Sequence, residues 1–236
     1  MSESPTVIVF DIDGTLLHSV GHHQAALLDA YAELGVRIGD RALSDFPDHT
    51  DSAIYDLLLS EVRGEPASAA DFDQLDAVLE RHYLRRMHAQ PPLFVAGAHE
   101  LLAQLDGDER LSVAFATGSM RGVAGHKLAQ LGVDLDTAVL ATASEATTRE
   151  RIVARAIDIA AGAARVPPRA LSIGDGLWDL RTAFALGLPF VAVESGTHSF
   201  ASGPVHSVAD LRSLTADQLL LLLADDTSFP LQTATT

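Results

Sequence analysis

Short apolar runs rich in β-branched residues recur along the chain and predict buried strands. The expected strands cover residues 7–10, 111–116, 138–140, 170–173 and 190–193. Between them, apolar residues return every three or four positions, which predicts helices. The expected helices of this part cover residues 97–105, 121–132, 149–164, 179–186 and 216–223. Strands that alternate with helices predict a three-layer, Rossmann-like α/β fold built on a parallel sheet.

One long segment between the first two strands departs from this alternation, because it contains helical spacing alone. Three helices are expected in it, covering about 21–34, 48–63 and 71–90, and Gly or Pro residues follow each of them. Since the first strand belongs to the sheet, we expect this all-helical segment to be inserted after it as a separate domain. The predicted division is a core domain of residues 1–17 and 91–225, a helical domain of residues 18–90 and a loose tail of residues 226–236.

Polar side chains follow three of the expected strands at their carboxyl ends, where open parallel α/β sheets bind ligands. The first strand runs into Asp11 and Asp13, whose side chains point to the same side because they are two positions apart. Two carboxylates this close repel each other unless a cation or a shared proton relieves them. Taken alone, the pair also fits an ordinary Asp-Gly turn after a strand.

Two later strand ends supply what this pair lacks. Thr117 and Gly118, in a Thr-Gly-Ser sequence before a helix, offer a hydroxyl and backbone N–H groups that can hold an anion. Asp175 and Asp179 follow the fourth strand and, with Asp11, form a cluster of the hard oxygen ligands that Mg²⁺ prefers. Each of these short sequences is common in turns. Their joint occurrence at one sheet edge predicts a site where an anion meets a metal ion.

The same residues carry a family resemblance. Residues 11–17 (DIDGTLL), 117–119 (TGS) and 174–179 (GDGLWD) resemble the first, second and fourth motifs of the haloacid dehalogenase superfamily. The helical insertion resembles the C1-type cap of subclass I of that superfamily. The resemblance implies a Mg²⁺-dependent phosphatase that hydrolyses a small phosphorylated metabolite through an aspartyl-phosphate intermediate.

The resemblance also implies a role for each residue. Asp11 is the expected nucleophile, and Asp13 is expected to protonate the leaving alcohol and then activate water. Thr117 and Gly118 are expected to hold phosphate oxygens. Asp13 counts against a dehalogenase, because C–halogen cleavage has no oxygen leaving group to protonate. The expected metal ligands are Asp11, the backbone carbonyl of Asp13, Asp175, and Asp179 directly or through water.

The third motif of the superfamily, a lysine, has no counterpart at its usual place. Lys127 is the only lysine of the chain and lies too near the second motif. Arg149 and Arg151 are therefore the candidates for the cation that bridges Asp11 and the phosphate, and Arg149 agrees better with the usual separation from the fourth motif. Arginine keeps the positive charge and can bind bidentately, but it is bulkier than lysine.

Four other residues near these motifs carry weaker signals. His23, with its neighbour His22, begins the first inserted helix close to the site, and we expect both to be solvated surface residues. Arg121 is a candidate anion contact because it follows the Thr-Gly-Ser sequence. Trp178 fits equally well with lining the site and with packing beneath the inserted domain.

Composition narrows the classes of partner. The 236 residues include 16 Lys and Arg against 32 Asp and Glu, and the resulting net charge of −16 repels nucleic acid and anionic membranes. The longest apolar run outside the strands, 219–224, is too short to cross a bilayer. The chain has no cysteine and no signal-peptide pattern at its start. We therefore expect a soluble, cytoplasmic protein, and the resemblance of its cap implies a monomer or homodimer.

Two other functions stay open. A phosphoglucomutase-like phosphotransferase would share these motifs and the cap, but it would need groups in residues 18–90 that hold a bisphosphate. A catalytically silent binding protein of the same fold is disfavoured by the complete set of acids. Phosphonate hydrolysis is less favoured still, because it uses a lysine in the cap and residues 18–90 contain none.

Overall fold

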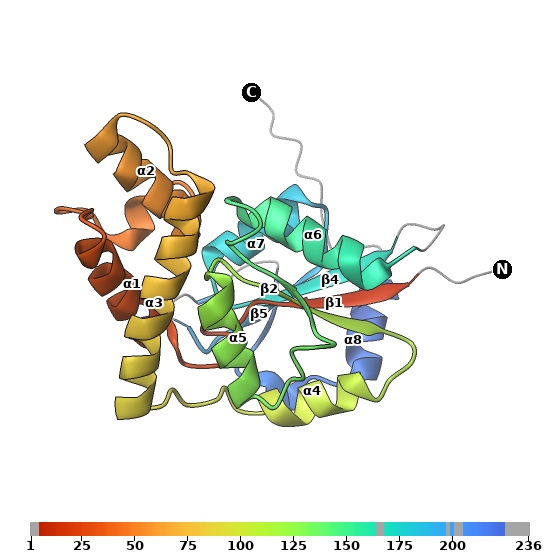
Figure 1. The fold of residues 1–236 in the computed structure, drawn as a ribbon. Helices are drawn as coiled ribbons and strands as arrows, with labels where there is room; N and C mark the ends of the chain where they lie inside the picture. Colours follow the sequence, from red (N-terminus) through yellow and green to blue (C-terminus); the bar gives the residue numbers. More distant parts are fainter. Residues whose placement is uncertain (1–4, 164–167, 197–198, 201–204, 225–236) are drawn as a thin grey trace.

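A parallel sheet forms the centre of the computed structural model, which describes residues 5–163, 168–196, 199–200 and 205–224 (Figure 1). The six strands lie in the order β3-β2-β1-β4-β5-β6, and every neighbouring pair is parallel. This arrangement confirms the predicted α/β fold. The strands are β1 (Thr6–Phe10), β2 (Ser112–Ala116), β3 (Val139–Ala141), β4 (Arg169–Gly174), β5 (Phe190–Val193) and β6 (His206–Val208).

The central position of β1 brings the predicted strand ends together. Phe10, its last residue, pairs in register with Phe115 of β2 on one side and with Ile173 of β4 on the other. The residues that follow these three strands therefore emerge side by side at one edge of the sheet. β6 was not predicted, because its three residues are half-buried or exposed and carry little apolar pattern.

Helices cover both faces of the sheet (Figure 1). Val7 and Val9 of β1 pack on the side of α6, whereas Ile8 and Phe10 pack on the side of α4, α5 and α8, as period-two alternation requires. The predicted helix 149–164 ends at Ala161, and residue 164 lies outside the described ranges. The core helices are α4 (Ala98–Asp106), α5 (Arg121–Gln130), α6 (Arg149–Ala161), α7 (Leu177–Ala185) and α8 (Ala216–Ala224), and a 3₁₀ turn covers Leu211–Ser213.

Residues 18–90 form an all-helical insert, called the helical insert below. It contains α1 (Val20–Glu33), a 3₁₀ turn (Leu43–Asp45), α2 (Asp51–Arg63) and α3 (Ala69–Ala89). Its interior includes Tyr31 and Tyr55, whose stacked rings lie 5.8 Å apart between centroids. The insert stands beside the end of the sheet where β1 finishes, and α3 packs against α5 (Figure 1).

The described helices show no membrane-crossing candidate, since each is too short or too polar to traverse a bilayer. The predicted loose tail, residues 226–236, lies outside the described residues.

Candidate active site

Three buried carboxylates meet where β1 and β4 end. Asp11 extends the β1 ladder, and its backbone N–H donates to the carbonyl of Ile173 at 2.9 Å. Asp175 follows β4, and Asp179 lies in the first turn of α7, where its Oδ2 accepts from the N–H of Gly176 at 3.0 Å. One carboxylate oxygen from each of the three acids lies within 4.8 Å of the others. The structure thus brings together the metal-site residues that the sequence predicts on these two strands.

The three carboxylates are buried and repel one another, so the cluster favours a bound cation. Desolvation, followed by repulsion from Asp11, raises the pKa of Asp175 to about 7. Desolvation and the neighbouring carboxylates likewise raise the pKa of Asp179 well above its ordinary value, and desolvation raises that of Asp11. A divalent cation would remove this cost, and all three donors are the hard oxygens that Mg²⁺ takes. The residues therefore fit the metal that the sequence implies.

Gly14 allows this packing. Its φ of +85° lies in the left-handed region, and a Cβ at this position would lie 2.2 Å from Oδ2 of Asp175. The hydroxyl of Thr15 donates to Oδ1 of Asp175 at 3.2 Å. The residues between Asp13 and the helical insert thus serve to seat the Asp175 carboxylate.

Arg149, and not Arg151, reaches the cluster. It is the first residue of α6, and its Nη1 lies 2.9 Å from Oδ1 of Asp11 and 3.4 Å from Oδ1 of Asp179. Its Nε donates to the backbone carbonyl of His49 in the helical insert at 3.1 Å. Arg151 is exposed. Arg149, at the start of α6, therefore supplies the cation beside Asp11, and it is the candidate that the sequence spacing favoured.

Thr117 and Gly118 lie at the end of β2, beside this cluster. Thr117 is buried, and its hydroxyl accepts from the backbone N–H of Ser119 at 3.1 Å. A Cβ at Gly118 would lie 2.4 Å from the His49 carbonyl oxygen and 2.9 Å from Nε of Arg149. Glycine at this position is what allows Arg149 and the helical insert to approach the strand end.

Asp13 has partners of its own, which include the single lysine of the chain. Nζ of Lys127 lies 2.5 Å from its Oδ2, and the lysine side chain is wholly buried. The hydroxyls of Ser119 and Ser19 donate to its two carboxylate oxygens at 2.9 Å and 2.5 Å. Burial alone would raise the pKa of Asp13, but the charge of Lys127 and the hydrogen bonds from Lys127 and Ser19 outweigh it and hold that pKa well below its usual range.

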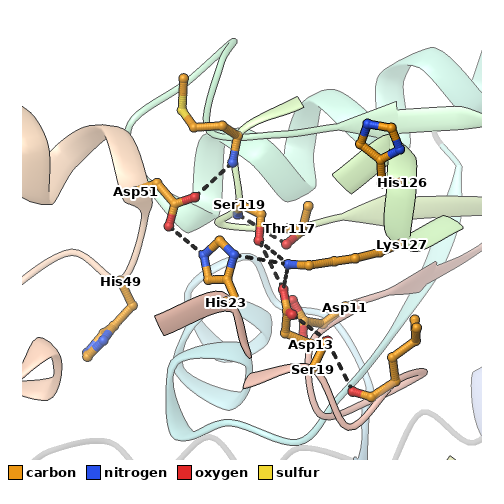
Figure 2. Close-up of polar contacts among 12 residues, drawn as sticks. Asp11, Asp13, Ser19, His23, His49, Asp51, Thr117, Ser119, His126 and Lys127 are labelled. Carbon is orange, nitrogen blue, oxygen red and sulfur yellow. Dashed lines mark hydrogen bonds and ion pairs between the residues drawn. The ribbon is translucent and has the colours of Figure 1, made fainter. Parts of the chain in front are cut away.

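Lys127 also joins the core to the helical insert (Figure 2). Nζ lies 3.3 Å from Nδ1 of His23 on α1, and Nε2 of that ring lies 2.9 Å from Oδ1 of Asp51 on α2. The other oxygen of Asp51 accepts from the backbone N–H of Met120 in the core at 2.9 Å. Because an ammonium group only donates, Nδ1 accepts and Nε2 carries the proton. A continuous chain of polar contacts therefore crosses from Asp13 to the insert and back.

Sequence reasoning missed most of this second group. The expectation that His23 is a solvated surface residue is wrong, because it is buried between Lys127 and Asp51. Lys127 carried a usable signal. It lies three and four positions after Ala124 and Val123, on the buried face of α5, where an unpaired lysine would be costly.

Two further sequence candidates have definite places. Arg121 pairs with Glu145 at 2.6 Å and donates to the carbonyl of Leu140 at 2.9 Å, so its charge is used in a local pair away from the carboxylate cluster. Trp178 lines a cavity, and its ring centroid lies 4.9 Å from that of His49.

That cavity, of about 360 Å³, lies between the helical insert and the strand ends. Its core side contains Asp13, Ser119 and Arg149. The whole lining is Asp13, Val20, His23, Gln24, Leu27, Leu43, Ser44, His49, Thr50, Asp51, Ile54, Gly118, Ser119, Arg149 and Trp178.

Comparisons with known proteins identify a matching family and a shared fold. A model of the haloacid dehalogenase-like hydrolases matches residues 5–187. No curated protein is similar enough in sequence to match the chain. Among solved structures, a hydrolase from Pseudomonas syringae superposes with a TM-score of 0.65 at 22% identity, covering 89% of this chain and 94% of that one.

Two other solved structures share the fold. CbbY from Rhodobacter sphaeroides, in complex with phosphate, superposes with a TM-score of 0.62 at 21% identity, covering 88% of this chain and 95% of its own. A β-phosphoglucomutase from Pyrococcus superposes with a TM-score of 0.57 at 17% identity, covering 93% of this chain and 99% of its own. At these identities the likeness concerns the fold.

Proposed function

Because the chain belongs to the haloacid dehalogenase-like hydrolases, we propose that it hydrolyses a small phosphomonoester through an aspartyl-phosphate formed on Asp11. The contact of Arg149 with Asp11, beside the carboxylates of Asp175 and Asp179, carries this proposal. This contact brings a buried nucleophile and a fixed cation next to a set of potential metal ligands at one edge of the sheet. The solved structure of CbbY with phosphate supports it, since that protein of the same fold holds this anion.

In the first step, a carboxylate oxygen of Asp11 attacks phosphorus, and the bond from phosphorus to the ester oxygen breaks. Arg149 holds Asp11 through Oδ1 and offers charge to the phosphoryl oxygens. Thr117 and the backbone at Gly118, which follow the adjacent strand β2, orient the same oxygens in this proposal. The leaving alkoxide takes a proton from Asp13.

In the second step, Asp13 accepts a proton from water as the water attacks phosphorus, and inorganic phosphate leaves as Asp11 is regenerated. Lys127, Ser119 and Ser19 hold the Asp13 carboxylate in one orientation. The arrangement in the structure favours the ionised form of Asp13 and therefore suits this second, water-activating step. The proton that Asp13 takes from water in this step is the one that it donates to the leaving alkoxide in the next turnover.

We propose Mg²⁺ as the cofactor, held by the side chains of Asp11, Asp175 and Asp179 and by the backbone carbonyl of Asp13. When bound, it supplies the positive charge that these carboxylates and a phosphate dianion together lack. Arg149 alone faces two of the three carboxylates, so the protein's own cation offsets only part of their charge.

The helical insert serves in this proposal as a cap that closes over a small substrate. Its residues form much of the lining of the 360 Å³ cavity, which admits a metabolite rather than a folded phosphoprotein. A net charge of −16 speaks against nucleic acid as a partner. We further propose a cytoplasmic location and a monomer or homodimer.

The test is hydrolysis of p-nitrophenyl phosphate in the presence of Mg²⁺. Asp11→Asn should abolish turnover with the circular dichroism spectrum unchanged, because the amide cannot form the phosphoenzyme. Asp136→Asn makes the same substitution at an exposed acid and should keep full activity. Undiminished hydrolysis by Asp11→Asn would contradict the proposed nucleophile. Activity that persists after the metal is chelated would contradict the proposed metal dependence.

A further inference from the structure

The two sides of the cavity differ in chemistry. The core side carries Asp13 and Arg149, where the phosphoryl group is handled. The opposite side comes from the helical insert, and beside His23, His49 and Asp51 it presents an apolar wall with a few uncharged polar groups. The apolar residues of this wall are Val20, Leu27, Leu43 and Ile54, and the uncharged polar residues are Gln24, Ser44 and Thr50.

The charged groups around the cavity already have partners of opposite charge. Arg149 is bound to Asp11 and Asp179, and Lys127, which lies behind the lining, is bound to Asp13. His23 has both ring nitrogens engaged, one by Lys127 and the other by Asp51. All fifteen lining residues belong to the described part of the chain, and Arg149 is the one lysine or arginine among them.

A second anionic group on the substrate would therefore meet an unfavourable environment. Beyond the phosphoryl position it would lie against apolar side chains, with the carboxylates of Asp13 and Asp51 nearby. His49 is the other lining side chain able to carry a positive charge, and its ring packs on Trp178 at 4.9 Å between centroids. Removing an anion from water is unfavourable where no cation partners it.

We infer that the substrate is a monophosphate ester of an uncharged alcohol, one that carries neither a carboxylate nor a second phosphate on its leaving group. This inference rests on the proposed function. The apolar wall contacts the carbon skeleton of the alcohol, and Gln24 and Ser44 at the cavity margin take its hydroxyl groups. The same reasoning disfavours a phosphotransferase that must hold a bisphosphate in this cavity.

Two matched substrate pairs test the inference. Phenyl phosphate and 4-carboxyphenyl phosphate differ by one carboxylate, as do glycerol 3-phosphate and 3-phosphoglycerate. In each pair the uncharged member should have a kcat/KM at least about tenfold higher, because the anionic member loses its hydration without gaining a cation. The para carboxylate does not make the phenolate a poorer leaving group, so a lower rate for that ester reports binding.

A gain-of-charge variant sharpens the test. The side chain of Gln24 is exposed at the cavity margin, so Gln24→Arg places a cation there without disturbing the core. It should raise kcat/KM for the carboxylated member of each pair relative to the uncharged one. Leu28→Arg adds the same charge to the same helix outside the lining and should leave both ratios unchanged.

The outcomes separate the inference from the function beneath it. If no phosphate ester is hydrolysed, the proposed function fails. If esters are hydrolysed but the anionic members are turned over as well as the uncharged ones, or better, the inference is overturned and the phosphatase stands. If neither Gln24→Arg nor Leu28→Arg changes the ratio of kcat/KM between the carboxylated and the uncharged substrate, the lack of a cation in this wall does not set the selectivity and the inference is overturned.

Discussion

Nζ of Lys127 lies 2.5 Å from Oδ2 of Asp13, inside the protein, and no part of the lysine side chain is exposed. The chain has no other lysine. A buried ammonium is tolerated only where a charge of opposite sign and further acceptors surround it, and here Ser119 and His23 complete that shell. The pair therefore joins Asp13, the proposed acid–base residue, to the interface between the core and the helical insert.

Lys127→Met should destabilise the protein by roughly 3 kcal/mol, because it leaves a buried carboxylate without its cation. Urea unfolding of the metal-free protein measures this. The double variant Asp13→Asn with Lys127→Met should recover much of the loss, since it removes both charges. Equal losses in the single and double variants would show that Lys127 contributes packing alone.

The kinetic constants of Lys127→Met distinguish a role in positioning Asp13 from a role in binding substrate. Lys127→Met should lower kcat more than it raises KM, because Asp13 is no longer held in one orientation while the phosphate site stays intact. Lys127→Arg, which keeps the charge, should recover part of kcat. A rise in KM with kcat unchanged would contradict a positioning role for Lys127.

Arg149→Ala should lower kcat/KM for p-nitrophenyl phosphate on the order of 10² to 10³, because it removes the cation 2.9 Å from Asp11. Arg151→Ala is the matched control, with an exposed side chain two residues away, and should be close to wild type. Steady-state kinetics with excess Mg²⁺ measures both. Similar losses in the two variants would mean that the charge of the helix start, and not Arg149 itself, acts on the substrate.

Much of this architecture follows from local pattern. β1 and its two neighbours are short, mostly apolar runs whose last residues are buried, so both their existence and the convergence of Asp11, Thr117 and Asp175 could be predicted. The family match confirms the resemblance that these residues carry. α7 begins two residues earlier than expected, because Asp179 caps its first turn as well as lying in the carboxylate cluster.

What escaped prediction depends on contacts between distant segments. Asp51 and Lys127 are far apart in the sequence and come together through His23 only because the helical insert packs on the core, with α3 against α5. A histidine near a helix start is usually solvated, and spacing within α1 does not reveal which core side chain it will meet. β6 was missed for a different reason, since an edge strand of three residues buries too little to show a pattern.

Asp51→Ala should loosen the contact between the helical insert and the core. Its Oδ2 accepts from the backbone N–H of Met120, and its own N–H donates to the carbonyl of Gly118. Loss of the carboxylate should speed hydrogen exchange at the Met120 amide and raise KM, because the insert no longer holds the closed arrangement. Amides of β4 serve as the internal reference. An unchanged exchange rate at the Met120 amide would contradict this role of Asp51.

The metal-free protein should lose stability as pH rises from about 4 to about 7. The native pKa of Asp175 is raised to about 7 from 3.8, so within this window the native state binds more protons than the unfolded state. The lowered pKa of Asp13 acts below this window and does not reverse the slope. Thermal unfolding in EDTA, compared with Mg²⁺, measures the effect.

Added Mg²⁺ should raise the melting temperature more at pH 7.5 than at pH 5, because the metal binds the ionised carboxylates. Asp175→Asn should flatten the dependence in EDTA and weaken the response to Mg²⁺. A metal-free protein that becomes steadily more stable from pH 4 to pH 7, together with a melting temperature indifferent to Mg²⁺, would contradict the assignment of Asp175 to a metal site.

The central claim is that Asp11 takes the phosphoryl group. Mixing enzyme with excess phenyl phosphate and Mg²⁺, quenching in acid within the first turnovers and sequencing the peptides by mass spectrometry tests it most directly. The account predicts one phosphoryl group on Asp11, removed by hydroxylamine and missing in Asp11→Asn. Steady turnover with no phosphoryl group on Asp11, or with the group on another residue, would contradict it.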